Sequence, residues 1–163
     1  MFWGAFSWGA RTSLWPLMGD PLSQRGGVTG RRILECLQEN LPTICEPGSI
    51  LIQDNVSTHT AKIVQEWLKE FTEENGIEVV DWPPYSPDLN PIENVWKLLK
   101  ERIMKEYPEL TDLSKNKESK KRLVRAAIDC WESFEEGIMN SLAFSMQRRL
   151  EAVIAADGWY TKY

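Results

Sequence analysis

The sequence predicts an α/β fold in which a mixed sheet is flanked by helices and followed by an α-helical C-terminal tail. Short apolar strand-like runs alternate with amphipathic helical patterns through the first two thirds of the chain, an order that favours parallel strands. After about residue 119 only helical patterns follow. With 163 residues and a hydrophobic content of 42%, the chain is long and apolar enough for one domain with a real core.

The first predicted elements are two strands. Residues 2–8 (FWGAFSW) and 12–17 (TSLWPL) are short aromatic and β-branched runs separated by the turn sequence GAR, which indicates a hairpin. The glycine- and proline-containing stretch GDPLSQRGG is typical of a loop. Residues 30–41 then carry apolar side chains at positions 33, 34, 37 and 41, the spacing of one face of a helix.

Two strand-helix units are predicted next. The run SILIQ reads as a buried strand that ends at Asp54, and THTAKIVQEWLKEF places its apolar side chains on one helical stripe. In the second unit IEVVDW is a strand, PPYSPDLN is irregular because of its prolines, and PIENVWKLLKERIMKEY is an amphipathic helix. Asp54 is therefore expected where a strand gives way to a helix.

The last third of the chain is predicted to be helical. Two periodic apolar stripes support this: Leu123, Ala127, Trp131 and Phe134, and then Ile138, Leu142, Met146, Leu150 and Val153. The polar, lysine-rich stretch PELTDLSKNKESKKR before them is either an exposed loop or a linker. Most tryptophans occupy apolar-face positions, so we expect them in the core: Trp3, Trp8, Trp15, Trp67, Trp96 and Trp131.

Charge and cysteine content narrow the function classes. A net charge of −5 argues against a wholly basic nucleic-acid coat, although an acidic protein can carry a local basic face. The three cysteines are odd in number and lack metal-binding spacing, which indicates neither a disulfide framework nor a zinc site. There is no apolar run of membrane-spanning length and no secretory signal pattern, so we expect a nuclear or otherwise intracellular protein.

Two carboxylates are the candidate catalytic and metal-binding residues. In open parallel sheets, ligands bind beyond the carboxyl ends of the strands, where Asp54 is expected. Glu93 begins the helix that follows the next strand. Two carboxylates at one rim suit Mg²⁺ or Mn²⁺, a hard cation that prefers oxygen ligands and retains several waters. Such ions activate a water or hydroxyl and stabilise the leaving oxygen in phosphodiester cleavage.

The same residues also fit ordinary helix starts. In NPIE, Asn90 can cap the helix, proline suits its first turn, and Glu93 can complete a capping box. Asp54 can belong to a capping turn with Ser57 or Thr58 as the cap and His59 exposed in the first turn. Spacing alone favours these structural readings.

The phrases ILIQDNVSTHTAK and VVDWPPYSPDLNPIENVWKLLK together resemble the catalytic core of mariner-superfamily (Tc-type) transposases, whose third acidic residue lies in a WPPxSPDLNPIE block. The resemblance implies a ribonuclease H-like fold, DNA cleavage and strand transfer, Mg²⁺ (or Mn²⁺) as cofactor, and Asp54 and Glu93 as the second and third members of an acidic triad. It further implies that residues 1–110 form a partial catalytic domain. Residues 111–163 would be the lysine-rich loop and C-terminal helices that pack on it.

The chain departs from this family pattern at its start. The first triad aspartate and its strand, central in the family's sheet, have no counterpart, and Asp20 in the loop GDPL is not expected to replace it. Loss of one carboxylate weakens the metal site, so we expect little cleavage by this chain alone. The strands that flanked the missing one would have to pair with each other or with another chain, or the domain would be only marginally stable. A non-enzymatic DNA-binding or dimerisation module is therefore the alternative reading.

A basic stretch beside Glu93 is the candidate DNA-binding surface. Residues 97–125 contain ten basic residues against five acidic ones, beginning with Lys97, Lys100 and Arg102. Phosphate contacts of this kind give affinity for double-stranded DNA without sequence reading. A solvated helix face with ion pairs explains the pattern equally well. Arg148 and Arg149 either extend a groove or solubilise a helix, and the chain is a possible homo-oligomer.

Overall fold

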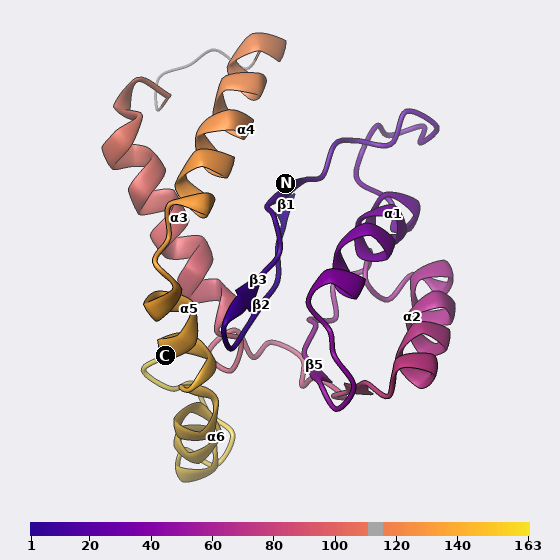
Figure 1. Ribbon diagram of the computed structural model, residues 1–163, viewed down its shortest axis with the longest axis vertical. Helices are drawn as coiled ribbons and strands as arrows, with labels where there is room; N and C mark the ends of the chain where they lie inside the picture. Colours follow the sequence, from indigo (N-terminus) through magenta and orange to yellow (C-terminus); the bar gives the residue numbers. More distant parts are fainter. Residues whose placement is uncertain (111–115) are drawn as a thin grey trace. The chain divides into compact units, whose positions relative to one another are not determined.

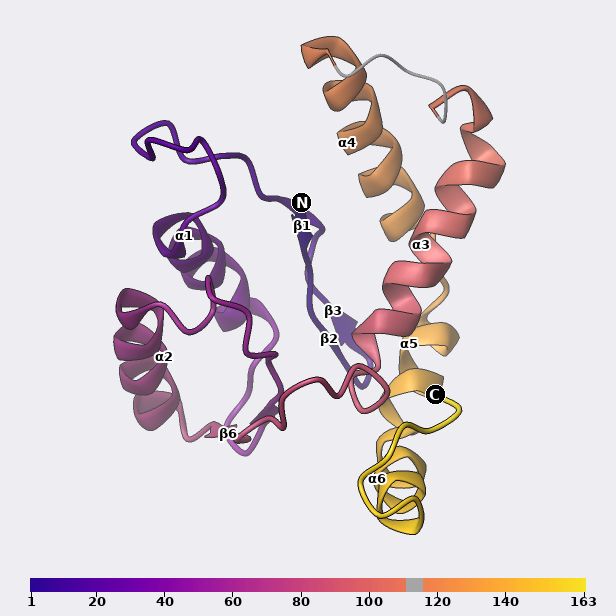
Figure 2. The ribbon, with the colours of Figure 1, turned by 180° about the vertical axis from the view of Figure 1, so that it is seen from behind.

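The computed structural model describes residues 1–110 and 116–163, and these residues form two compact units. The first unit comprises residues 1–5 and 15–85, and the second comprises residues 6–14 and 86–163. Figures 1 and 2 show the elements of both from opposite sides. The predicted boundary at residue 110 does not coincide with the boundaries of these units, and the predicted two-domain division stays a prediction.

The predicted N-terminal hairpin is confirmed and contributes to both units. Its base pairs β1 (Phe2–Trp3) with β4 (Trp15–Pro16), and its tip pairs β2 (Phe6–Ser7) with β3 (Ala10–Arg11), both antiparallel. The turn after β2 passes through Gly9 at φ +71, a left-handed conformation that glycine adopts without steric cost.

The first unit continues with helix α1 (Gly30–Asn40), the 3-10 turn η1 (Leu41–Thr43), β5 (Ile50–Leu51), α2 (Lys62–Asn75) and β6 (Glu78–Val79). Strands β5 and β6 pair in parallel, with Ile50 opposite Glu78 and Leu51 opposite Val79. The predicted strand-helix-strand unit is thereby confirmed. Among the described residues, β1 pairs only with β4 and β5 only with β6.

The core of the first unit lies where α1 packs on α2. Its fully buried side chains follow the helical spacing seen in the sequence: Leu17, Ile33, Cys36, Leu37, Leu41, Val64 and Leu68. Burying one such leucine contributes about 1.5–3 kcal/mol. The two helices approach closely at Gly30, where an added Cβ would lie 2.6 Å from the Cβ of Ala61. A larger residue at position 30 would therefore push α1 away from the segment that leads into α2.

The second unit is predominantly helical. Helix α3 (Ile92–Glu106) is followed by the 3-10 turn η2 (Pro108–Leu110), and then by α4 (Lys117–Glu132), α5 (Glu136–Ala143) and α6 (Met146–Ala155). Figure 1 shows α3 and α4 running side by side, and the predicted helical tail is thus confirmed. Part of the predicted lysine-rich loop, residues 111–115 with Lys115, lies outside the described residues.

Trp131 joins the hairpin tip to the helices of the second unit. Its side chain is fully buried, stacks on Trp96 with ring centroids 5.6 Å apart, and donates from Nε1 to the main-chain oxygen of Thr12 at 2.8 Å. The prediction that the tryptophans are core residues holds for Trp131 but is wrong for Trp8, which is 59% exposed. Trp8 sits near the hairpin turn, where its ring makes a T-shaped contact with the ring of Phe144 at 4.2 Å between centroids.

Candidate active site

The first half of the candidate site follows β5 in the first unit. Asp54 lies three residues beyond β5, and its side chain is 41% exposed. Nδ1 of His59 lies 2.7 Å from Oδ1 of Asp54. An ionised carboxylate only accepts hydrogen bonds, so the geometry requires the hydrogen on Nδ1, which leaves Oδ2 of Asp54 available to another ligand.

A tight turn holds His59 in this position. The amides of His59 and Thr60 both donate to the main-chain oxygen of Val56, at 2.8 and 3.0 Å, and Nε2 of Gln65 on α2 donates to the main-chain oxygen of His59 at 2.8 Å. Helix α2 begins only at Lys62, with Ala61 as its N-cap and no side-chain cap. The alternative in which Ser57 or Thr58 caps this helix is therefore wrong, because the turn at residues 56–60 comes first.

The segments that follow the two parallel strands are tied together. Nδ2 of Asn55 donates to the main-chain oxygen of Trp82 at 2.6 Å, linking the residue after Asp54 to the segment after β6. Trp82 is buried, which makes this link a firm one. The expectation that Asp54 lies at the carboxyl ends of parallel strands is confirmed within the first unit.

The second half of the candidate site is the first turn of α3 in the second unit. Glu93 is exposed, and its carboxylate forms no hydrogen bond or ion pair with the residues that the structure describes. Oδ1 of Asn90 accepts from the amide of Ile92 at 3.4 Å, a loose version of the predicted cap, but Glu93 does not return the bond. The capping-box reading is thus wrong for Glu93, which contributes only its charge near the positive end of the helix.

The two carboxylates belong to different units, so their sharing of one ion stays a prediction. Within residues 1–110 and 116–163 no three His, Cys, Asp or Glu side chains form a cluster suited to a metal. Asp20 is not the missing third acid, because it is 2% exposed and already occupied. It accepts from Oγ1 of Thr29 at 2.7 Å and from the amide of Leu22 at 2.9 Å, and Arg31 lies 3.3 Å away.

The candidate DNA-binding residues divide into two kinds. Lys97 and Lys100 are exposed and continue the stripe of α3 that begins at Glu93, since residues three and four apart share a helix face. Arg102 turns the other way: Nη1 donates to the main-chain oxygen and Oγ of Ser133 at 3.0 and 2.9 Å, and its guanidinium lies 4.6 Å from the Phe134 ring centroid. Arg102 therefore fastens α3 to the C-terminal end of α4.

The basic residues of α4 agree in part with the alternative interpretation, a solvated helix face that carries ion pairs. Lys117, Lys120, Lys121, Arg122 and Arg125 are all exposed. Two of them form exposed ion pairs, Lys121 with Glu118 and Arg122 with Glu109. Pairs of this type contribute little stability, so the helix keeps a basic but partly neutralised face.

Arg149 corrects another expectation. Instead of lining a groove or solubilising a helix, its side chain is 1% exposed and all three of its donor nitrogens are engaged. Burial lowers the pKa of its guanidinium. Position 149 lies seven residues after Leu142 and three after Met146, both on the predicted apolar stripe, and this register was the signal in the sequence that it would be buried.

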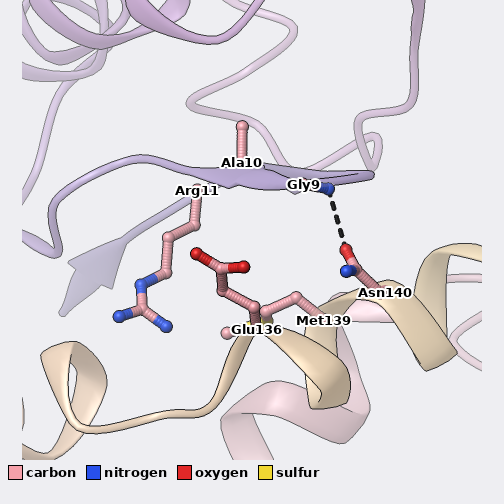
Figure 3. A pocket seen from close by; sticks show the side chains of 6 residues that line it. All are labelled: Gly9, Ala10, Arg11, Glu136, Met139 and Asn140. Atoms are coloured by element: carbon pink, nitrogen blue, oxygen red, sulfur yellow. Dashed lines mark hydrogen bonds between the residues drawn. The ribbon is translucent and has the colours of Figure 1, made fainter.

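A hollow of about 270 Å³ lies in the second unit, between the hairpin turn and α5 (Figure 3). Its polar groups are used to hold the hairpin. The amide of Gly9 donates to Oδ1 of Asn140 at 2.8 Å, and the guanidinium of Arg11 donates to the main-chain oxygens of Phe134 and Glu132 at 2.6 and 2.7 Å. None of the candidate catalytic residues lines it.

A family model described as DDE superfamily endonuclease matches residues 23–114, a stretch that includes both Asp54 and Glu93. The chain belongs to the DDE superfamily endonucleases. The family match thus covers most of the first unit together with α3, and the recognition based on the QDN and SPDLNPIE phrases is confirmed.

This DDE superfamily chain is similar to several transposases of transposable elements. The Tcb1 transposase of Caenorhabditis briggsae is 32% identical over 168 residues, covering 100% of this chain and 54% of the relative. The Tc1 transposase of Caenorhabditis elegans is 33% identical over 116 residues, covering 71% of this chain and 38% of the relative. The chain spans about half the length of the curated relatives it matches along its whole length.

Solved structures confirm the predicted α/β, ribonuclease H-like fold class for this DDE superfamily chain. The catalytic domain of the Mos1 mariner transposase has a TM-score of 0.61 at 21% identity, covering 99% of this chain and 82% of that one. Structures of that domain contain Mn or Mg, and a Mos1 paired-end complex contains the left transposon end. That complex has a TM-score of 0.59 at 22% identity and covers 96% of this chain and 46% of that one.

None of the helices within residues 1–110 and 116–163 combines the length and the apolar character needed to cross a bilayer.

Proposed function

We propose that this chain is the catalytic-domain portion of a Tc1/mariner-type transposase, which cleaves DNA phosphodiesters and transfers strands during DNA transposition and integration. One observation carries the proposal. The stretch that matches the DDE endonuclease family contains a carboxylate after a parallel strand pair, Asp54, and a second carboxylate in the first turn of the next helix, Glu93. These are the two kinds of position at which α/β sheets present catalytic groups.

The proposed metal ligands are Asp54 and Glu93, and the ion is Mg²⁺ or Mn²⁺. The donor set fits such an ion, because Asp54 has one oxygen outside its bond to His59 and the Glu93 carboxylate has no partner among the described residues. Both side chains are accessible, which suits a hard cation that keeps part of its water shell. When bound, such an ion activates the attacking water or 3′-hydroxyl and stabilises the leaving oxygen.

The other proposed roles belong to residues around these two. His59 orients the Asp54 carboxylate by donating from Nδ1. Lys97 and Lys100, exposed on the same stripe of α3 as Glu93, contact phosphates of double-stranded DNA. Arg102 contributes less to binding, because its guanidinium already donates to Ser133. The proposed partners are duplex DNA and a second copy of the chain, and the proposed location is the nucleus.

We expect cleavage by this chain alone to be weak. Cleavage with two metal ions needs enough carboxylates to bind both ions. Among the described residues no three metal-binding side chains form a cluster, and the buried Asp20 carboxylate already accepts a hydrogen bond from Thr29. The alternative, a DNA-binding or dimerisation module without catalysis, shares the same scaffold.

The test measures nicking of supercoiled duplex DNA in Mg²⁺ or Mn²⁺, together with DNA binding by filter retention. Asp54→Asn and Glu93→Gln each remove a proposed ligand, and Glu74→Gln, on the exposed face of α2, is the matched control. Metal-dependent nicking that both ligand variants abolish and the control keeps supports the transposase reading. DNA binding without any nicking, unchanged in all variants, supports the binding module instead.

A further inference from the structure

We propose that Arg149 is a positioning residue for Glu93, holding the first turn of α3 so that the Glu93 carboxylate faces outward in a fixed direction. The inference rests on the proposed metal-binding role of Glu93. All residues involved belong to the second unit.

The contacts of Arg149 span three separate segments. From α6, Nε donates to Oγ of Ser145 at 2.8 Å, Nη1 donates to the main-chain oxygen of Asp88 at 2.6 Å, and Nη2 donates to Oδ1 of Asn94 at 2.6 Å. One planar guanidinium thus binds the start of α6, the loop before α3 and α3 itself. A lysine has a single nitrogen and cannot reproduce this fork.

The bond to Asn94 controls the rotation of α3 about its axis. Asn94 follows Glu93 directly, and adjacent helical residues point about 100° apart, so fixing one side chain inward fixes where its neighbour points. The bond to Asp88 fixes the loop that delivers the chain into this turn. At the start of the helix, the amides of Glu93 and Asn94 donate to the main-chain oxygens of Asn90 and Pro91, each at 3.2 Å.

The C-terminal segment closes the arrangement from the other side. The amide of Thr161 donates to Oδ2 of Asp88 at 3.0 Å, and the Tyr163 ring centroid lies 4.9 Å from the guanidinium carbon of Arg149. The buried guanidinium therefore has an aromatic face and an oxygen acceptor for each of its three nitrogens, and no described carboxylate forms an ion pair with it. A solvated helix does not require a buried arginine with three hydrogen bonds. Two of the bonds of Arg149 go to the segment that leads into and begins α3, the helix whose first turn carries Glu93.

The test uses amide hydrogen exchange and Mn²⁺ titration of the whole chain. Arg149→Met removes all three bonds, and Asn94→Ala removes only the link to α3, which keeps the experiment informative if the first variant folds poorly. Arg148→Met, the exposed neighbour on α6, is the matched control. The loss of a charge-assisted hydrogen bond should speed exchange at residues 93 and 94 by about tenfold in both test variants. Exchange near Ala127 and Cys130 in α4 should stay at the wild-type rate in Asn94→Ala.

The Mn²⁺ arm separates this inference from the proposed function. We expect Mn²⁺ affinity to fall about tenfold in Asn94→Ala, as it does when residues that orient metal ligands are removed, and to fall further in Glu93→Gln. Unchanged exchange at residues 93 and 94 in both variants would overturn the positioning role. Faster exchange uniformly across α3 and α4 in Asn94→Ala would also overturn it, since Arg149 would then serve only stability. If exchange at residues 93 and 94 is faster but Glu93→Gln leaves the Mn²⁺ affinity unchanged, the proposed metal site is overturned. The role of Arg149 in holding the first turn of α3 would then still stand.

Discussion

Nδ1 of His59 lies 2.7 Å from Oδ1 of Asp54, and the turn at residues 56–60 holds the imidazole in that position. The single histidine of the chain is thus hydrogen-bonded to Asp54, one of the two candidate metal ligands. Bonds of this type fix the orientation of a ligating carboxylate and leave its second oxygen free for the ion.

Replacing His59 by alanine should therefore weaken metal binding at Asp54. We expect the Mn²⁺ dissociation constant, measured by electron paramagnetic resonance of free Mn²⁺, to rise by about tenfold. Thr60→Ala, in the same turn but exposed, is the control. An equal affinity in His59→Ala and wild type would show that the imidazole only packs the turn.

Trp131 should be the most sensitive single position for the stability of the second unit. Trp131→Ala removes a fully buried ring and its bond to Thr12, and we expect the free energy of unfolding in urea to fall by about 3–5 kcal/mol. Trp8→Ala, which removes an exposed ring of the same size, should cost about 1 kcal/mol. Similar losses in the two variants would contradict the packing described for Trp131.

Asp20 should make the stability of the fold sensitive to acid. The hydrogen bond from Thr29, the amide of Leu22 and the nearby Arg31 lower the pKa of Asp20 from its ordinary value of 3.8. A lowered folded-state pKa stabilises the fold above pH 3.8, and this stabilisation is lost as the pH falls through the folded-state value. Thermal unfolding between pH 6 and pH 2 should show a shallower acid loss in Asp20→Asn than in wild type. Parallel curves would mean that Asp20 does not titrate differently in the folded state.

Lys97 and Lys100 should each account for about one phosphate contact. In Lys97→Gln and in Lys100→Gln, the slope of log K for duplex DNA against log salt should become less negative by about 0.9. Lys69→Gln on α2, an exposed lysine that pairs with Glu73, serves as the control and should leave the slope unchanged. An equal change in all three variants would point to general charge in place of a defined strip on α3.

The cysteines should behave as buried thiols. Burial raises the pKa of Cys36 to about 12, and burial together with Glu106 raises the pKa of Cys130 to about 11. Both should resist Ellman's reagent at pH 8 in the folded protein and react once urea unfolds it, because the thiolate is the reactive species. Rapid modification of Cys36 under native conditions would mean that α1 separates readily from α2.

The helices and the hairpin followed from periodicity because the geometry of each element fixes the spacing of its apolar side chains. Ile33 and Leu37 on α1, and Val64 and Leu68 on α2, are buried where the 3.6-residue spacing placed them. The start of α2 did not follow in the same way. The sequence allowed the helix to begin at Thr58, but the bonds of His59 and Thr60 to Val56 form a separate turn before it.

The sequence singles out the two candidate ligands, whose roles stay a prediction, but it does not reveal the residues that pack around them. Asp54 and Glu93 stood out because their surrounding phrases are distinctive, whereas the role of Arg149 depends on acceptors 55 and 61 residues earlier in the chain, in Asn94 and Asp88. Spacing along one helix cannot reveal such partners. Trp8 failed for a related reason, since an aromatic in a short strand is buried only if another element covers that face.

We propose that Asp54 and Glu93 hold one divalent ion between them, and a cleavage experiment tests this proposal directly. Fe²⁺ bound in place of Mg²⁺ generates hydroxyl radicals with ascorbate and peroxide, which cut the backbone next to the ion, and mass spectrometry locates the cuts. We predict cuts near residues 54 and 93 together, and the loss of both sets in Asp54→Asn. Cuts near residue 93 that persist unchanged in Asp54→Asn would contradict the claim.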